Sequence, residues 1–214
     1  MKAESSFVKT VVRLLDNRIL CLVAWVVGVV YITVYGFLKN PIEYTASMIG
    51  LDYPVAFIFW GILSSIALFL NIRLMYRRYR IRNKIGYICM ALGSVCIMTT
   101  VFIPSTEEMG LQLIAHWGTA LLFAVFFAAA IILFLILLAR KKDRASLITL
   151  IAFALILILM LALLGVFGKN GLIESLPMWA AYLILFLYNY TPVYRTALHN
   201  SRTESDAATE SEKQ

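Results

Sequence analysis

Long apolar runs alternate with short polar segments along most of the chain. Five of the runs cover residues 19–38, 54–74, 85–103, 117–139 and 147–167, and a sixth has Pro177 near its first turn and ends in the aromatic stretch 188–195. About 20 apolar residues in a helix cross the hydrocarbon core of a bilayer. Because hydrocarbon offers the backbone no hydrogen-bond partner, each run predicts a helix. We therefore predict an all-α fold: a polytopic integral membrane protein built as a bundle of six transmembrane helices.

The two ends of the chain differ in character from these runs. Residues 1–18 combine apolar positions on one side of a helical projection with Lys9, Arg13 and Asp16 elsewhere. This pattern predicts an amphipathic, basic N-terminal segment, although a plain basic flank on the cytoplasmic side explains the same charges. Residues 196–214 are rich in Ser, Thr, Glu and Ala without apolar periodicity, which predicts a disordered cytoplasmic tail. The transmembrane domain then covers residues 19–195.

Residues 71–84 are the most one-sided segment, with six basic residues and no acidic one. A short loop of this kind between apolar runs stays on the cytoplasmic side during insertion. This orientation places 17 of the 19 lysines and arginines inside and leaves only Lys39 and Lys169 outside, so we predict that both termini are cytoplasmic. The residues predicted to contact anionic lipid headgroups are Arg77, Arg78, Arg80, Arg82 and Lys84.

Composition and charge disfavour several classes of function. The chain is 62% hydrophobic and 14% charged, whereas soluble domains average about 25% charged residues. Its net charge of +7 comes from short loops whose charge the topology explains, so we predict no nucleic-acid partner. The three cysteines lie in apolar runs without metal-ligand spacing, and we predict no disulfide framework, metal or cofactor. The apolar cores lack Asp, Glu, Lys and Arg, which disfavours pumps, ion-coupled carriers and voltage sensors.

Small and polar residues at helical spacing predict how the helices pack, and they leave faces on which a homo- or hetero-oligomer could form. The expected contact positions are Gly61 and Ser65 in the second run, Gly86, Met90, Gly93, Ile97 and Thr100 in the third, and Ala120, Ala124 and Ala128 in the fourth. The fifth run is almost entirely Leu, Ile and Ala, which predicts a lipid-facing helix. Asn189 is predicted to hydrogen-bond to another helix.

Polar residues also gather in the two loops on the predicted outer side. The candidate ligand-binding residues are Ser47 and Asp52 in the first loop and Glu107 and Glu108 in the second. His116 follows them and is the candidate catalytic residue, because an imidazole can act as acid or base near neutral pH. The alternative is structural: residues 117–139 already suffice to cross the membrane, so His116 can be an interface anchor beside Trp117 or a packing residue.

The outer loops also carry a family resemblance. The segment NPIEYTASMIG at residues 40–50, Phe102-Ile-Pro104 and His116 together resemble the prokaryotic six-helix membrane proteins catalogued as domain of unknown function 998 (DUF998). That family is similar in outline to the Frag1/DRAM/Sfk1 membrane proteins. The likeness covers residues 19–140 and implies the six-span fold, a prokaryotic plasma membrane and a role for Ser47, Pro104 and His116. Met48 stands where the family pattern has an acidic residue.

Two hypotheses of function follow, from different classes. In the first, the protein is a non-enzymatic membrane component that binds lipid or a partner protein, with its basic face on anionic headgroups. In the second, it has an outward-facing site for a small molecule or a lipid headgroup, hydrolase-like or carrier-like, centred on His116. The absence of charged residues from the apolar cores favours the first hypothesis.

Cysteine labelling tests the predicted topology. In a variant that lacks Cys21, Cys89 and Cys96, the substitution Glu108→Cys should react with an impermeant reagent in intact cells, because its loop is predicted to be outside. Ser205→Cys should react only after the membrane is permeabilised. Labelling of position 205 in intact cells, with none at 108, would refute the topology.

Overall fold

The computed structural model describes residues 15–103, 105 and 110–192. Within these ranges the chain is all-helical, with α2 (Arg18–Gly36), α3 (Ala46–Asp52), α4 (Pro54–Arg78), α5 (Lys84–Phe102), α6 (Leu111–Arg140), α7 (Arg144–Phe167) and α8 (Gly171–Tyr190). All of these helices except the short α3 are long and apolar enough to cross a membrane, which gives six candidate spans among the described residues. The prediction of a six-helix, multi-pass membrane protein is confirmed. The predicted amphipathic residues 1–14 and the tail 196–214 lie outside the described residues.

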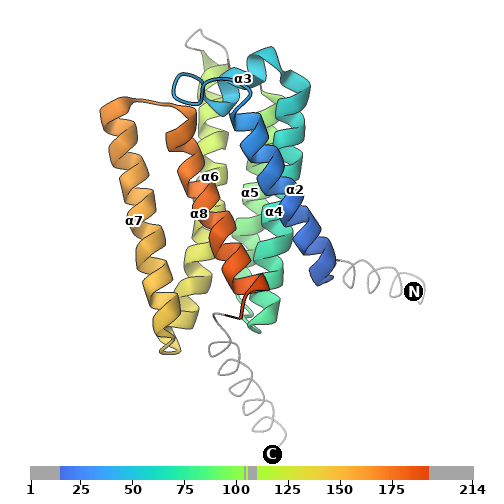
Figure 1. The fold of residues 1–214 in the computed structure, drawn as a ribbon, viewed down its shortest axis with the longest axis vertical. Coiled ribbons are helices and arrows are strands. Elements are labelled where there is room, and N and C mark those ends of the chain that lie inside the picture. The colour runs from blue at the N-terminus through green and yellow to red at the C-terminus, as the bar shows by residue number, and fades with distance from the viewer. Residues whose placement is uncertain (1–14, 104, 106–109, 193–214) are drawn as a thin grey trace, which may run out of the picture.

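The long helices run side by side, with α7 at one edge of the bundle (Figure 1). Helix α4 packs against α2, α5, α6 and α8, whereas α7 packs against α6 and α8. The start of α2, the end of α8 and the α4–α5 and α6–α7 connections all lie at one end (Figure 1). We call it the basic end, because it carries the basic residues of 73–84 and 140–144, and it is the end predicted to be cytoplasmic. The other end, which holds α3, is called the opposite end.

Two of the predicted packing stripes are confirmed. A Cβ atom at Gly61 would lie 2.4 Å from Cγ1 of Val101, so α4 and α5 approach closely at this glycine. All five positions of the predicted α5 stripe are buried. A Cβ atom at Gly93 would lie 2.9 Å from the Phe127 ring, which places this stripe against α6. In α7, by contrast, the described residues that are buried are Ser146 and Phe153, as expected of a lipid-facing helix.

The alanine stripe predicted for the fourth run is wrong as the packing face of α6. Ala124 is exposed, whereas α6 buries Phe123, Phe127 and Phe134 together with Ile131. Lipid tails are as apolar as these side chains, so van der Waals packing rather than water avoidance selects the inward face. Aromatic rings fill the space between helices and make more contacts than methyl groups, which explains the rotation of α6.

Two helices begin earlier than the sequence pattern predicts. Helix α6 begins at Leu111, so that His116 lies in its second turn rather than before the span. Helix α8 begins at Gly171, where the Asn170 side chain accepts a hydrogen bond from the Ile173 amide at 3.0 Å, and Pro177 therefore lies inside the helix rather than in its first turn. The 30 residues of α6 are about 45 Å long, more than the roughly 30 Å of hydrocarbon, so its polar start projects beyond the predicted span.

A buried hydrogen-bond network joins α2, α4 and α8 near the basic end. Asn71 of α4 is fully buried, and its Nδ2 donates to the carbonyl oxygens of Cys21 in α2, at 3.0 Å, and of Ala67, at 2.9 Å. The Asn189 amide donates to the Asn71 carbonyl at 2.9 Å, and the Tyr190 hydroxyl donates to Asn71 Oδ1 at 2.6 Å. The predicted interhelical bond of Asn189 is confirmed, and one α4 side chain fixes the relative position of three helices.

A matched pair of glycine substitutions tests the α4–α5 contact. Gly61→Ala should lower the free energy of unfolding by about 1–3 kcal/mol, because the new methyl group collides with the β-branched Val101. Gly165→Ala in α7 meets open space within 4 Å and should be neutral or stabilising by up to about 1 kcal/mol. Thermal unfolding in detergent measures both. Equal melting temperatures for the two variants would contradict the close packing.

Candidate functional site

The opposite end contains a short helix that the sequence pattern did not predict. Helix α3 begins after Thr45, whose side chain accepts a hydrogen bond from the Met48 amide at 3.3 Å. It carries the candidate Ser47, which is buried and lies 3.1 Å from the Thr45 hydroxyl. The N-cap sequence Thr-Ala-Ser is the local signal that could have revealed this helix. Ser47 is therefore engaged in the start of α3.

Asp52, the other candidate described in this region, pairs with a cation. Its carboxylate accepts a hydrogen bond from Lys39 Nζ, and both side chains are partly exposed. This hydrogen bond raises the pKa of Lys39, whose ammonium also lies 4.4 Å from the centre of the Tyr44 ring. Asp52 thus neutralises Lys39 at the surface of the opposite end. Such exposed pairs contribute little to stability.

His116 is buried, with 1% of its surface exposed, so it is not the exposed interface anchor that one alternative predicted. Its Nδ1 lies 2.7 Å from the carbonyl oxygen of Ile103, which can only accept, so Nδ1 carries the proton. Its ring centre lies 6.3 Å from that of Phe57, which in turn stacks on Trp60 at 5.6 Å. The imidazole therefore packs in an aromatic cluster and ties the end of α5 to α6. Trp117 beside it is about half exposed.

The described part of the predicted outer site does not form one constellation. Ser47 bonds to Thr45, Asp52 to Lys39 and His116 to Ile103, and none of these contacts joins the three candidates to one another. Glu107 and Glu108 lie outside the described residues, as does Pro104. Within residues 15–103, 105 and 110–192, no three His, Cys, Asp or Glu side chains lie close enough to hold a metal ion. The geometry that is described favours packing over acid–base chemistry for His116.

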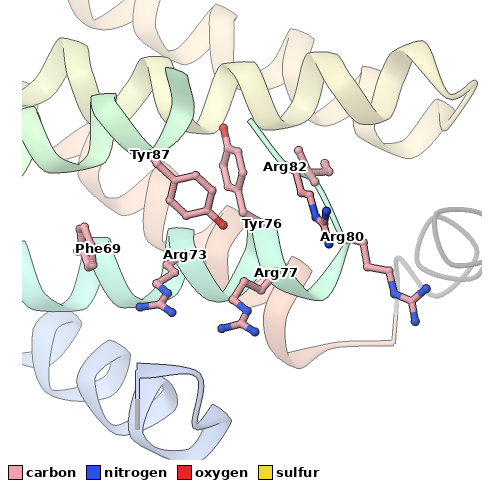
Figure 2. Close-up of a pocket in the computed structure, with 8 residues that line it drawn as sticks. Phe69, Arg73, Tyr76, Arg77, Arg80, Arg82 and Tyr87 are labelled. Atoms are coloured by element: carbon pink, nitrogen blue, oxygen red, sulfur yellow. The ribbon is translucent and has the colours of Figure 1, made fainter. Parts of the chain in front are cut away.

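The basic end contains a pocket of about 630 Å³ beside α4, which we call the arginine pocket. It is lined by Phe69, Arg73, Tyr76, Arg77, Arg80, Ile81, Arg82 and Tyr87, four of which are arginines and none of which is acidic. Arg73 and Arg77 extend from α4 on the side that faces the start of α2, and Tyr87 reaches across from α5 (Figure 2). The pocket therefore combines a dense positive charge with aromatic walls.

Two arginines of the pocket share one carboxylate. Asp16, two residues before α2, lies 3.1 Å from Arg73 through Oδ1, and its Oδ2 accepts a hydrogen bond from Nη1 of Arg77. The Arg73 side chain is 14% exposed and lies more than one turn inside the end of α4. The basic loop predicted over residues 71–84 starts later than expected, because α4 continues to Arg78 and includes Arg73. Asp16 offsets part of the cost of placing Arg73 at this depth.

The other two arginines lie on the tight turn that ends α4. The Ile81 amide donates to the Tyr76 carbonyl at 2.9 Å, and the Arg80 amide donates to the Arg77 carbonyl at 3.1 Å. These two bonds form a Schellman motif, in which the residue after the helix takes a left-handed conformation. That residue is Arg80, with φ of 53°, a position usually occupied by glycine. The turn reverses the chain and brings Arg82 to the same pocket as Arg73 and Arg77.

The remaining predicted headgroup contacts do not line the pocket. Arg78 donates from Nη1 to the Asn189 carbonyl near the end of α8, so this arginine links α4 to α8. Lys84 is the exposed first residue of α5. The structure therefore brings together three of the five predicted residues, Arg77, Arg80 and Arg82, and adds Arg73 and the aromatic lining that the charge pattern missed. The four-residue spacing of Phe69, Arg73 and Arg77 is the sequence signal that these three side chains share one face of α4.

Substitution of His116 tests whether its ring stabilises the fold by packing. His116→Ala should lower the free energy of unfolding by about 2–4 kcal/mol, because it leaves a cavity beside Phe57 and removes the bond to Ile103. Ile114→Ala, at an exposed position of the same helix, should cost less than about 0.5 kcal/mol. Thermal unfolding measures both changes. A His116→Ala variant as stable as Ile114→Ala would show that the ring contributes nothing to packing.

Comparison of the chain with family models, curated proteins and solved structures found no match. The resemblance to the DUF998 family stays a prediction, and the arginine pocket is supported by the geometry of this chain alone.

Proposed function

We propose that this protein is a non-enzymatic membrane component that binds an anionic phospholipid at its basic end. The observation that carries the proposal is the arginine pocket, in which four arginines from α4 and the following turn line one cavity. Guanidinium groups are planar, stay charged at every physiological pH and bind phosphate oxygens in pairs. A phosphate-bearing headgroup is therefore the ligand whose chemistry fits the lining best.

The shape of the pocket favours a lipid over a soluble phosphate. Its lining runs along α4 from Arg77 to Phe69, eight residues or about 12 Å toward the middle of the span. The arginines lie at the end predicted to face the headgroup layer, and the partly buried Phe69 lies at the membrane end. A phospholipid placed with its phosphate on the arginines would have its glycerol and first acyl carbons beside Phe69. A free phosphate would use only half of the lining.

The second hypothesis of function, an outward-facing site centred on His116, gains no support from the described contacts. His116, Ser47 and Asp52 each bond to another residue, and His116 is enclosed by Phe57 and the end of α5. Binding without catalysis at the basic end is therefore the function that the geometry supports best. Location in a prokaryotic plasma membrane remains part of the proposal, on the resemblance alone.

Lipid titration of charge variants tests the proposal. The purified protein in mild detergent is titrated with phosphatidic acid and with phosphatidylcholine, and bound lipid is counted by native mass spectrometry. Wild type should bind phosphatidic acid more tightly. The triple variant Arg73→Gln, Arg77→Gln, Arg82→Gln should lose about 1 kcal/mol, or about fivefold in affinity, for each charge removed. Arg80 is left in place because it occupies the left-handed position of the turn, so a substitution there would test the backbone as well as the charge.

A matched control removes the same number of charges from the same end. The variant Arg140→Gln, Lys141→Gln, Arg144→Gln alters residues at the α6–α7 connection, which do not line the pocket, and should keep the wild-type affinity. Arg82→Gln alone leaves Asp16 paired and covers the case in which the pocket triple variant does not fold. Equal loss in both triple variants would mean diffuse attraction rather than a site. If inorganic phosphate displaced bound phosphatidic acid as effectively as short-chain phosphatidic acid does, the ligand would not be a lipid.

A further inference from the structure

Asp16 lies against the proposed lipid site and bears on how that site is filled. It is a carboxylate within the described chain that pairs with Arg73 and Arg77 at the same time, one through each oxygen. A headgroup phosphate on the arginine pocket would seek the same guanidinium N–H groups. Asp16 lies beside the pocket rather than in its lining, and it pairs with two of the arginines that an acidic ligand would also bind.

The position of Asp16 is set by the start of α2. Asn17 caps this helix, because its side-chain oxygen accepts hydrogen bonds from the amides of Ile19 at 2.9 Å and Leu20 at 3.3 Å. The Cys21 amide donates to the Asn17 carbonyl at 3.0 Å, which completes the first turn. Asp16 precedes this cap, so the ion pair with Arg73 and Arg77 also ties the first turn of α2 to α4. Asn71 still holds the Cys21 carbonyl, so release of Asp16 would loosen the beginning of this turn rather than detach α2 from α4.

We infer that Asp16 is an internal competitor for the arginine pocket, so that an entering lipid phosphate displaces Asp16 from Arg73 and Arg77 and loosens the start of α2. The inference rests on the proposed function and adds regulation to it. A phosphate carries more charge and more acceptor oxygens than one carboxylate, so it can replace Asp16 on both arginines. While the pocket is empty, the same carboxylate offsets the cost of holding Arg73 at membrane depth. Lipid occupancy is thereby coupled to the order of the N-terminal side of α2.

The competition makes the affinity of the pocket depend on one charge. The Asp16→Asn variant should still prefer phosphatidic acid over phosphatidylcholine. Its affinity for phosphatidic acid should be about three- to tenfold higher than that of wild type, which is the effect expected for one charge at a partly exposed site. Asp143→Asn is the matched control, because Asp143 is an acidic N-cap at the same end and Asn retains its capping ability. Its carboxylate accepts hydrogen bonds from Ser146 rather than from an arginine of the pocket, so the substitution should leave the affinity unchanged.

A double-variant cycle and hydrogen exchange complete the test. In the background Arg73→Gln, Arg77→Gln, the substitution Asp16→Asn should no longer change the affinity, since the competed groups are gone. In wild type, phosphatidic acid should speed amide exchange at residues 19–21, and phosphatidylcholine should not. Asp16→Ser replaces Asp16→Asn if the latter does not fold.

The outcomes separate this inference from the proposed function. If wild type does not prefer phosphatidic acid, the lipid site itself is wrong, and the inference falls with it. If wild type does prefer it but Asp16→Asn binds equally or more weakly, only the inference is overturned, and Asp16 acts as a positioning residue for the arginines. A tighter Asp16→Asn variant without any change in amide exchange in wild type would overturn the displacement, because Asp16 would then repel the lipid from a fixed position.

Discussion

The hydrogen bonds of Asn71 hold together the part of the molecule on which the candidate site depends. This amide lies about 10 Å inside the end of α4 and bonds to α2 and, through Asn189 and Tyr190, to α8. Between transmembrane helices such bonds contribute about 0.6–2 kcal/mol each, and here they occur together on one residue. They fix the start of α2 beside the last turns of α4. In this arrangement Asp16 lies against Arg73 and Arg77.

The two ends of the bundle differ in how their polar groups are arranged. At the opposite end, the loop before α3 and the start of α8 pack so closely that a Cβ atom at Gly171 would lie 2.6 Å from the Tyr44 carbonyl oxygen. His116 is enclosed there and donates to Ile103. At the basic end, the Schellman turn brings Arg80 and Arg82 to the arginine pocket beside α4. One end is closed by internal bonds, and the other gathers four arginines around one pocket.

Arg73 connects the stability of this end to the proposed lipid binding. A cation one turn inside a transmembrane helix is costly unless it is paired or reaches the headgroup layer. Asp16 supplies a partner from within the chain, and a lipid phosphate would supply one from the membrane. The same physical requirement therefore explains both the internal ion pair and the proposed ligand. It also explains why the site lies beside α4, whose burial is the highest among the six candidate spans of the described residues.

The sequence by itself determined the number of spans, the concentration of basic residues between the second and third runs, the packing stripe of α5 and the interhelical role of Asn189. Those features depend on length, charge and spacing, which are local properties of the chain. Tertiary structure decided the rest. The burial of His116, the inward rotation of the α6 phenylalanines and the meeting of Asp16 with Arg73 and Arg77 each depend on which helices become neighbours. In lipid, apolar residues face either way at similar cost, so hydropathy cannot specify these contacts, and only the packed bundle brings residue 16 to residue 73.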